Sequence, residues 1–381
     1  MKAALVAGET SGDYLAGLLL DGMKPRWPDL NAFGIGGPQM AARGFDAWWP
    51  SDKLAVRGYV EVVRHYREIV GIRHNLKTRL LASPPDIFIG VDAPDFNLDL
   101  ERDLKAAGIK TVHFISPSVW AWRPERVDKI RQCVDHVLCI FPFEAALLAQ
   151  QGIAATYVGH PLASVIPLQP DKAAARACLG LKDDDQVVAI LPGSRQSEIQ
   201  YLASRFFGAV VPVKRACPAI KFVVPAIPAL KSQIEAAARQ AGVLTDVQIL
   251  SGQSHTALAA CDVALIASGT ATLEAALFKR PMVIAYNMNW LSWQIMRRKK
   301  LQPWVGLPNI LCGDFVVPEL LQDAATPEAL ATAVIAWLQA PAKIAALQSQ
   351  FTQLHTELKR NTAQLATDAL QKVLQAWASC S

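Results

Sequence analysis

Two carboxylates directly follow a short apolar segment in the first half of the chain. Residues Ile87–Val91 have the length and composition of a buried strand, and Asp92 and Asp95 come after it. Parallel α/β sheets bind ligands outside the carboxyl ends of their strands, where a carboxylate can take a proton from an attacking hydroxyl. We therefore predict that Asp95 is a general base and that Asp92 orients the loop. The alternative for Asp95 is an N-cap of the helix expected near Asn97.

Two loops in the second half combine small, hydroxyl-bearing and basic residues after a strand. They are Gly193, Ser194 and Arg195 after Val187–Leu191, and Ser268, Gly269 and Thr270 after Val263–Ala267. Glycine lets a ligand approach the backbone, helix N-termini bind anions, and arginine binds phosphate through two hydrogen bonds. Glu274, one helical turn beyond Thr270, suits the hydroxyls of a ribose. We predict a nucleoside-diphosphate site; the alternative for the first loop is a capped helix with a surface arginine.

Motifs of other nucleotide-binding classes are missing. The chain has no G-x-G-x-x-G fingerprint and no Walker lysine motif, which argues against a dehydrogenase and an ATPase. No D-x-D metal motif stands near the two loops, because Asp183–Asp185 precede a strand and are typical of a solvated turn. We therefore expect neither a metal ion nor a cofactor.

Three further sets of residues are candidates for binding the donor, the acceptor or a lipid. They are Glu9 and Ser11 after the apolar segment Ala3–Ala7; Trp120, Trp122 and Arg123 after Thr111–Ile115; and Asn309 in an irregular segment. A capped turn explains the first set equally well, and an ordinary core pair explains the tryptophans nearly as well. Asn309 can hydrogen-bond to the sugar donor or to the sugar acceptor.

The elements that position these residues alternate between strand and helix. In the first half, short apolar segments alternate with helical periodicity, which indicates βαβ units and a parallel sheet covered on both faces. A proline-rich segment, 159–171, is expected to be a hinge. A second alternating series follows, and after about Pro318 the chain is predicted to be wholly helical. We expect an N-terminal acceptor domain over 1–165, a donor domain over 172–340, and a C-terminal helical segment over 341–381 that returns to the first domain or to a partner subunit.

The segment 59–80 is amphipathic and basic. Its apolar side includes Val62, Val63, Tyr66 and Ile69, and its polar side carries several arginines and a lysine. This pattern suits a helix that lies on anionic lipid. The alternative is a helix packed on the sheet with a solvated basic face.

Composition sets the broad class. The chain has 381 residues with 52% hydrophobic and 19% charged residues, which is enough for two domains. A net charge of +5 suits anionic substrates or lipid and is too small to indicate nucleic acid. Seven scattered cysteines without a C-x-x-C pair suit reduced thiols. No uninterrupted run of 18 apolar residues occurs, so we expect a cytoplasmic protein.

Several of these segments together resemble the lipid-A-disaccharide synthase family. The matching segments are Leu5–Asp13, Gly90–Asn97, Ser116–Trp122, Leu191–Arg195, Ser268–Ala271 with Glu274, and Leu307–Asn309. They keep their order over almost the whole chain. The resemblance implies the GT-B fold, with two doubly wound Rossmann-like domains facing a cleft and a C-terminal helical closing segment.

The resemblance also implies a reaction and its site. A 2,3-diacylglucosamine unit would move from UDP-2,3-diacylglucosamine to 2,3-diacylglucosamine 1-phosphate, with inversion, giving a β-1,6-linked disaccharide and UDP. Asp95 matches the family's base; its other functionally important positions match Glu9, Asp86, Arg195, Glu274 and Asn309. The family is peripheral to the inner leaflet of the cytoplasmic membrane and can form homodimers through C-terminal exchange.

The chain departs from the family pattern at Ser164, where aspartate is frequent, and Arg57 and His65 make the amphipathic segment more polar. One rival interpretation is another GT-B enzyme, a UDP-N-acetylglucosamine transferase or 2-epimerase. A second rival is a catalytically silent lipid- or nucleotide-binding protein, which would bind anionic vesicles without releasing UDP.

Overall fold

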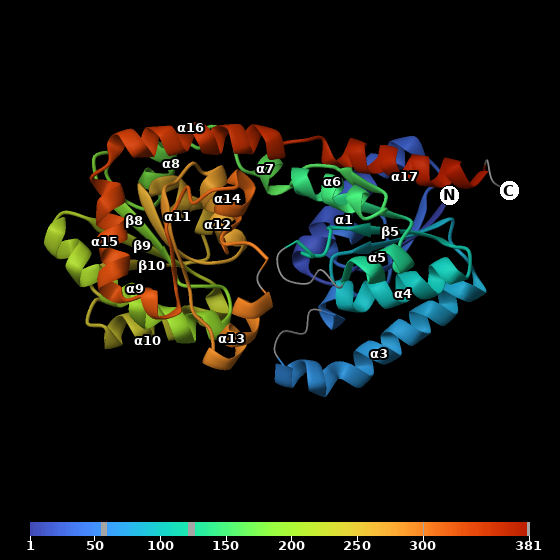
Figure 1. Cartoon of the computed structure of the whole chain (residues 1–381), viewed down its shortest axis with the longest axis horizontal. Coiled ribbons are helices and arrows are strands. Elements are labelled where there is room, and N and C mark those ends of the chain that lie inside the picture. Colours follow the sequence, from blue (N-terminus) through green and yellow to red (C-terminus); the bar gives the residue numbers. More distant parts are fainter. Residues whose placement is uncertain (55–58, 121–125, 300, 379–381) are drawn as a thin grey trace. The chain divides into compact units, whose positions relative to one another are not determined.

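The computed structural model describes residues 1–54, 59–120, 126–299 and 301–378, and these form two compact units. Unit 1 comprises Met1–Pro161 together with Leu358–Ser381, and unit 2 comprises Leu162–Glu357. The C-terminal segment is therefore divided between the units. The helix that ends the described chain belongs to unit 1 (Figure 1).

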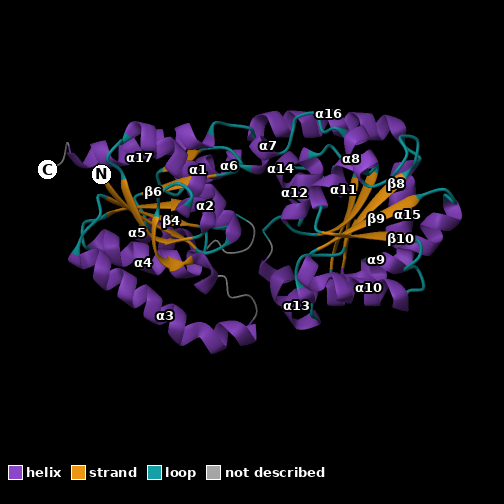
Figure 2. Ribbon diagram, turned by 180° about the vertical axis from the view of Figure 1, so that it is seen from behind, coloured by secondary structure: helices purple, strands orange, loops and turns teal. Residues whose placement is uncertain are grey.

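Unit 1 is built on a parallel sheet of seven strands in the order β3-β2-β1-β4-β5-β6-β7, with helices on both faces (Figure 2). Its strands are β1 (Lys2–Ala7), β2 (Asn31–Gly36), β3 (Asp46–Pro50), β4 (Ile87–Val91), β5 (Lys110–Phe114), β6 (His136–Cys139) and β7 (Ala155–Tyr157). Its helices are α1 (Thr10–Arg26), α2 (Pro38–Ala41), α3 (Tyr59–Ala82), α4 (Pro94–Ala106), α5 (Arg126–Cys133), α6 (Pro142–Gln150), α17 (Thr362–Ala378) and the 3-10 turn η1 (Ser51–Lys53).

Unit 2 has a parallel sheet of six strands in the order β10-β9-β8-β11-β12-β13. Its strands are β8 (Val187–Leu191), β9 (Lys221–Ala226), β10 (Val247–Ser251), β11 (Val263–Ala267), β12 (Met282–Tyr286) and β13 (Glu319–Leu321). Its helices are α7 (Leu162–Val165), α8 (Lys172–Cys178), α9 (Gln196–Ala216), α10 (Lys231–Gln240), α11 (Ser254–Ala260), α12 (Thr270–Leu277), α13 (Trp290–Lys299), α14 (Leu307–Cys312), α15 (Pro327–Leu338), α16 (Pro341–Leu358, whose last residue is counted with unit 1) and the 3-10 turns η2 (Pro228–Leu230) and η3 (Gln322–Ala324).

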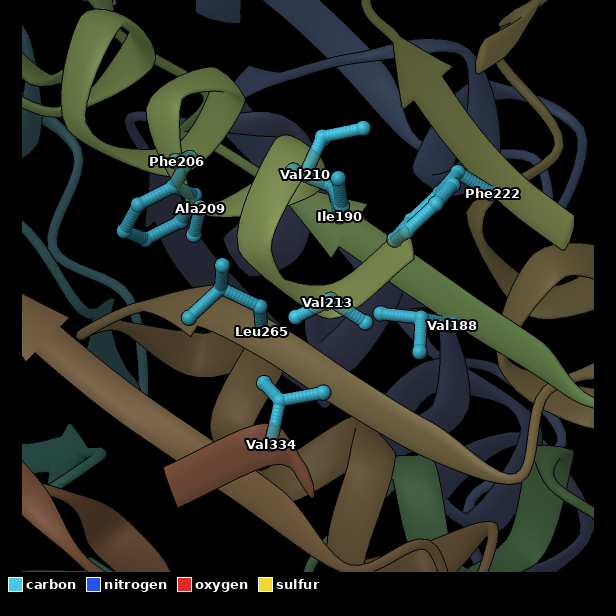
Figure 3. Close-up of a pocket in the computed structure, with 9 residues that line it drawn as sticks. All are labelled: Val188, Ile190, Phe206, Ala209, Val210, Val213, Phe222, Leu265 and Val334. Atoms are coloured by element: carbon cyan, nitrogen blue, oxygen red, sulfur yellow. The ribbon is translucent and has the colours of Figure 1, made fainter. Parts of the chain in front are cut away.

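The central strands are buried along their whole length, as expected of strands covered on both faces. All five residues of β4, β8 and β11 are buried. The core of unit 2 continues into α9 and α15, which pack on one face of the sheet. Figure 3 shows a pocket in this core, lined only by apolar side chains of β8, β9, β11, α9 and α15. Because no polar group faces it, we interpret this pocket as a packing void.

Two edge strands differ from the sequence predictions. The expectation of a wholly helical chain after about Pro318 is wrong, because Glu319–Leu321 form β13 and pair with β12. Residues Asp46–Pro50 form β3, which no apolar run indicated. Both strands are short and only partly buried, so neither carries the continuous apolar run by which the central strands are recognised.

A helix that spans a membrane must be both long and apolar. None of the described helices is, by itself, both long enough and apolar enough to cross a bilayer; only a sharply bent pair, Pro327–Leu338 with Pro341–Gln375, passes. In α15 of this pair, Leu330, Ala331 and Val334 are buried in the core of unit 2.

The C-terminal helix α17 lies along α1 at very short range (Figure 1). Arg26 of α1 pairs with Asp368 of α17 at 2.7 Å and also bonds to Gln371. A Cβ on Gly22 would lie 2.5 Å from Oγ1 of Thr367 and closer still to a backbone carbonyl of α17. Glycine is therefore required for α17 to approach α1 this closely.

We predict that Gly22→Ala lowers the free energy of unfolding of unit 1 by about 1–3 kcal/mol, because the added methyl forces α17 away from α1. Gly71→Ala in α3 is the matched control. No atom lies within 4 Å of its added methyl, so helix propensity should stabilise it by about 0.5–1 kcal/mol. Urea denaturation followed by circular dichroism measures both. Equal stability of Gly22→Ala and wild type would contradict the close packing.

Candidate active site

The two candidate loops of unit 1 lie where the strand order of its sheet reverses. β1 pairs with β2 on one side and with β4 on the other, so the loops that follow β1 and β4 are neighbours. Doubly wound sheets bind ligands at such switch points. The loops are in contact, since a Cβ on Gly8 would lie 3.0 Å from Cβ of Ala93. The structure thus brings the Glu9 loop and the Asp92–Asp95 loop together.

The loop after β1 contains one structural acid and two candidates for binding. Asp13 is buried, and its carboxylate accepts hydrogen bonds from the backbone N–H groups of Gly37, Gln39 and Met40 at 2.8–3.1 Å. Glu9 precedes α1 in extended backbone and does not cap the helix with its side chain. Ser11 is exposed in the first turn of α1. Glu9 and Ser11 remain candidates for contacting a ligand.

The turn from β4 into α4 is strained. Asp92 and Ala93 have φ angles of 55° and 44°, the left-handed region that non-glycine residues rarely adopt. Each such residue costs on the order of 1–3 kcal/mol and persists only where the surroundings enforce it. Here the Asp92 N–H donates to the Phe114 carbonyl at 2.9 Å, and Asn97 Nδ2 donates to the Asp92 carbonyl at 2.8 Å. These bonds bend the chain so that α4 starts directly at the sheet edge.

The N-cap alternative for Asp95 is wrong. Helix α4 begins at Pro94, its N-cap residue is Ala93, and no side chain of the described chain caps it. The helix therefore starts three residues earlier than the predicted start at Asn97, and Asp95 lies inside its first turn. Its side chain is 85% exposed, and Oδ1 accepts a hydrogen bond from Arg126 Nη2 at 2.6 Å. The carboxylate is thus available to a ligand.

Asp95 is the first of three acids spaced four residues apart on one face of α4. Asp99 pairs with Lys129 at 2.7 Å and with Arg73 at 3.1 Å, and Asp103 pairs with Lys77 at 2.8 Å. The side chains of Asp99 and Asp103 are each only 32% exposed. We call this series the α4 ion-pair ladder. Asp95 is its open end, with far more exposed surface than the two acids after it.

A buried polar cluster packs behind the strained turn. Glu101 and His113 are completely buried, and His113 Nδ1 lies 2.8 Å from Glu101 Oε1. Burial raises the pKa of Glu101, although the neighbouring His113 opposes this. Gly90 is required here because a Cβ would overlap Glu101 Oε1 and lie 2.9 Å from Cβ of Asn97. The cluster thus fills the space between β4 and α4 and fixes the angle at which α4 leaves the sheet.

Asp86 is placed away from this site. It precedes β4, at the amino end of the strand, where its carboxylate accepts a hydrogen bond from the Lys2 N–H at 2.7 Å. The five residues of β4 span roughly 17 Å at about 3.3 Å per residue, so Asp86 and Asp92 lie at opposite sheet edges. The expected catalytic position of Asp86 is thus corrected to a structural position that ties β1 to β4.

Trp120 belongs to a buried aromatic cluster. Its ring stands edge-on to Phe143 at 5.1 Å, and Phe141 stacks on His160 at 5.5 Å. Trp120 is 7% exposed, and its Nε1 donates to Glu144 Oε1 at 3.0 Å. The structure therefore supports the core alternative for Trp120 and corrects the expected acceptor contact. Trp122 and Arg123 lie outside the described residues.

The second half of α3 packs on the sheet of unit 1. Ile69 packs against the core cluster that contains Ile72, Leu76 and Leu80. On the polar side, Arg73 and Lys77 are committed to the α4 ion-pair ladder, and the guanidinium of Arg79 lies 3.5 Å above the ring of Trp48. Ile69 is only partly buried and makes a core contact, and its expected lipid contact stays a prediction. The side chains of Val62, Val63 and Tyr66 lie outside the described residues.

In unit 2, the strand order reverses between β8 and β11, and the two donor loops follow these two strands. After β8, Gly193 has a φ of 136°, and the Ser194 and Arg195 N–H groups donate to Glu198 Oε2 at 2.7 and 3.2 Å. The expected cap by Ser194 is corrected, because Glu198 supplies the capping carboxylate of α9. Arg195 is 69% exposed and lies 3.3 Å from Glu198 Oε1.

The loop after β11 is the more open of the two. Ser268 Oγ donates to the Val305 carbonyl at 3.2 Å, and Thr270 begins α12 with an exposed side chain. A Cβ on Gly269 would meet no atom within 4 Å. Glu274, one turn into α12, lies 3.6 Å from His255 Nε2 of α11. Burial raises the pKa of Glu274 and the histidine opposes this rise. The start of α12 at Gly269 therefore faces open space, and Glu274, one turn further along the helix, is 19% exposed.

Asn309 is completely buried. Its Nδ2 donates to the Val317 carbonyl and to Glu319 Oε1, both at 2.9 Å, and its Oδ1 accepts from the Val317 N–H at 3.0 Å. Glu319 also accepts from the N–H groups of Val305 and Gly306. This corrects the expected direct contact of Asn309 with a substrate. Its bonds hold the loop of Val305, which in turn accepts the hydrogen bond of Ser268.

The residues that the sequence analysis missed lie next to the candidate site residues but belong to other elements of the fold. Tyr286 ends β12, and its pKa is raised by burial and by Glu198 and lowered by Arg195, so it borders the first donor loop. His255 and Arg126 reach Glu274 and Asp95 from separate helices, which no sequence spacing indicates. Only Glu198 had a local signal, since a glutamate three residues after a helix start is typical of a capping box.

Two parallel doubly wound sheets, each with polar loops at its switch point, are the architecture of the GT-B fold. Among solved structures, a glycosyltransferase from Rickettsia africae superimposes with a TM-score of 0.59 at 10% identity, covering 98% of both chains. A UDP-GlcNAc 2-epimerase from Neisseria meningitidis, bound to UDP-GlcNAc, gives a TM-score of 0.63 at 11% identity over 99% of this chain and 100% of that chain. These similarities show the fold.

The family is shown by sequence. The chain belongs to the lipid-A-disaccharide synthetase family, whose profile matches residues 3–372. A lipid-A-disaccharide synthase from Albidiferax ferrireducens is 73% identical over 380 residues, covering 98% of each chain. The resemblance found in the sequence and the GT-B fold that it implied are thereby confirmed.

The buried carboxyl of Glu144 generates a pH prediction. Burial raises its pKa from 4.5 to about 7 in the folded chain. Between these values the folded chain keeps a proton that the unfolded chain has lost, so unfolding free energy falls as pH rises through this window, by an amount on the order of 3 kcal/mol. We expect Glu144→Gln to flatten this dependence.

Chemical denaturation of both proteins between pH 4.5 and 8 measures the effect. Glu328→Gln is the matched control, because Glu328 is an exposed glutamate, also in the first turn of its helix. Parallel stability curves for wild type and Glu144→Gln would contradict the assignment, whereas Glu328→Gln should follow wild type throughout.

Proposed function

We propose that this glycosyltransferase moves 2,3-diacylglucosamine from UDP-2,3-diacylglucosamine to 2,3-diacylglucosamine 1-phosphate. The products are the β-1,6-linked lipid A disaccharide and UDP. Membership of the lipid-A-disaccharide synthetase family supports this reaction. The observation that carries the mechanism is the exposed Asp95 carboxylate, which a strained turn holds at the switch point of unit 1.

The proposed chemistry is a single displacement with inversion. The acceptor 6-hydroxyl oxygen attacks the anomeric carbon of the donor while its proton passes to the Asp95 carboxylate. The bond between the anomeric carbon and the diphosphate oxygen breaks, and UDP leaves with the electron pair. Negative charge grows on the diphosphate, so cationic and N–H groups aimed at it lower the barrier.

Three parts of unit 2 are proposed to hold the UDP moiety. The N–H groups of Gly269 and Thr270, at the start of α12, are available to the diphosphate, since the surface at Gly269 is open, whereas the Ser268 N–H is bonded to the Ala285 carbonyl. Arg195 is exposed and can swing from Glu198 to a phosphate oxygen. Glu274 accepts the ribose hydroxyls, with His255 beside it. The reaction requires these groups and Asp95 to act on one donor–acceptor pair.

Peripheral association with the cytoplasmic face of the inner membrane is the second part of the proposal. The substrates carry acyl chains, so they reside in a bilayer, and the first half of α3 is apolar and basic in sequence. The second half of α3 is committed to the core and to the α4 ion-pair ladder. Lipid contact is therefore assigned to the first half. Exchange of α17 between two copies is the proposed route to a homodimer.

Vesicle co-sedimentation tests this assignment. The double change Val62→Ser with Val63→Ser should reduce binding to anionic phosphatidylglycerol vesicles without changing stability. Ile69→Ser should instead lower the free energy of unfolding, since Ile69 packs on the core. Unchanged sedimentation of the double variant, with wild-type protein bound, would contradict lipid contact by the first half of α3.

The general base is tested with Asp95→Asn. We expect kcat for disaccharide formation to fall about 10²–10⁴-fold, because the amide cannot take the hydroxyl proton, while UDP affinity measured by calorimetry stays the same. Asp103→Asn, from the other end of the α4 ion-pair ladder, should keep near-normal turnover. Full turnover by Asp95→Asn would reject the mechanism, and a purified wild-type enzyme that forms no disaccharide would reject the function.

A further inference from the structure

Arg126 holds the proposed base in an ion pair. Its Nη2 donates to Asp95 Oδ1 at 2.6 Å, and it is the first described residue of α5. The two partners differ greatly in exposure: the arginine side chain is 19% exposed and the aspartate side chain is 85% exposed. The guanidinium is thus anchored by its surroundings, whereas the carboxylate is open to solvent and to a ligand.

This pair opposes the chemistry proposed for Asp95. A proton transferred to the carboxylate would neutralise it and leave the positive charge of Arg126 without its partner. Such a transfer becomes easier if another anion takes over the guanidinium first. The base therefore needs a second negative group beside Arg126 at the moment when the acceptor hydroxyl reacts.

The other cations next to α4 are already committed. Lys129 and Arg73 pair with Asp99, and Lys77 pairs with Asp103. Of the cations on the α4 ion-pair ladder, Arg126 alone pairs with an acid that is largely exposed, so its present partner is the one that an anion can most readily replace. A phosphate carries more charge than a carboxylate and matches the planar guanidinium through two parallel hydrogen bonds.

We propose that Arg126 binds the 1-phosphate of the sugar acceptor and releases Asp95 when it does so; this inference rests on the proposed function. The guanidinium stays protonated throughout and exchanges the carboxylate for the phosphate. Asp95 then takes the proton of the acceptor 6-hydroxyl as the new glycosidic bond forms, and afterwards loses that proton to solvent. Asp95 is thereby released only when an acceptor that carries the phosphate is bound.

The test compares two acceptors, 2,3-diacylglucosamine 1-phosphate and the same sugar without its phosphate. For Arg126→Ala, we expect kcat/KM with the phosphorylated acceptor to fall about 10–100-fold, the size of a lost charge-assisted bond. With the phosphate-free acceptor, Arg126→Ala should equal or exceed wild type, since the base is then free. Arg126→Lys should recover part of the loss, because it restores the charge but not the planar geometry.

Two controls separate this role from a structural one and from donor binding. Arg131→Ala removes another arginine of α5, one that pairs with Asp128, and should leave both acceptors unaffected. The KM for UDP-2,3-diacylglucosamine should not change in Arg126→Ala. An equal loss with both acceptors would overturn the proposal, as would a loss that appears in the KM of the donor.

A direct binding measurement keeps this inference separate from the proposed reaction. Saturation-transfer NMR with glucosamine 1-phosphate and with glucosamine should show phosphate-dependent binding to wild type that Arg126→Ala loses. If wild type forms no disaccharide but shows this difference, the reaction is wrong and the phosphate site stands. If Arg126→Ala binds glucosamine 1-phosphate like wild type, the phosphate site is wrong whatever the enzyme catalyses.

Discussion

The left-handed turn at Asp92 and Ala93 is the constraint on which the site in unit 1 depends. Two consecutive non-glycine residues in this region cost several kcal/mol by themselves, so the turn exists only because the surrounding structure enforces it. Asn97 bonds to the Asp92 carbonyl, and the buried Glu101 and His113 fill the space behind it. Without this turn α4 would start farther from the sheet edge, and Asp95 would not reach the switch point.

The same constraint explains why the acids of α4 differ although they share one helix face. The turn places Asp95 at the exposed end of the α4 ion-pair ladder, where Arg126 is its ion-pair partner among the described residues. Asp99, one turn later, is enclosed by cations from α3 and α5, and its pKa is lowered because their attraction outweighs its burial. An exposed ion pair contributes only about 0–1 kcal/mol to folding, so the Asp95 carboxylate can change partners at little cost to the fold.

The sequence predicted the central strands and the loops after them well, and it predicted the contacts of individual side chains poorly. The buried central strands were recognisable because a strand covered on both faces is continuously apolar, and β8 was predicted with its observed bounds. The strand ends then located the loops of Asp95, Arg195 and Ser268. What a side chain does there depends on neighbours distant in sequence. Asn309 and Trp120 looked like ligand contacts, yet their polar atoms are bonded to Glu319 and Glu144.

The two donor loops of unit 2 show how such side-chain contacts change a functional interpretation. Both have small residues near a helix start, and the sequence combined them into one predicted nucleoside-diphosphate site. In the structure, Glu198 already accepts hydrogen bonds from the Ser194 and Arg195 N–H groups just before α9, so an anion at those two groups must first displace a carboxylate. No such carboxylate caps the start of α12 within the described chain, and the surface at Gly269 is open. The start of α12 is thus the more open of the two loops, and the Arg195 guanidinium at the other loop is 69% exposed beside Glu198.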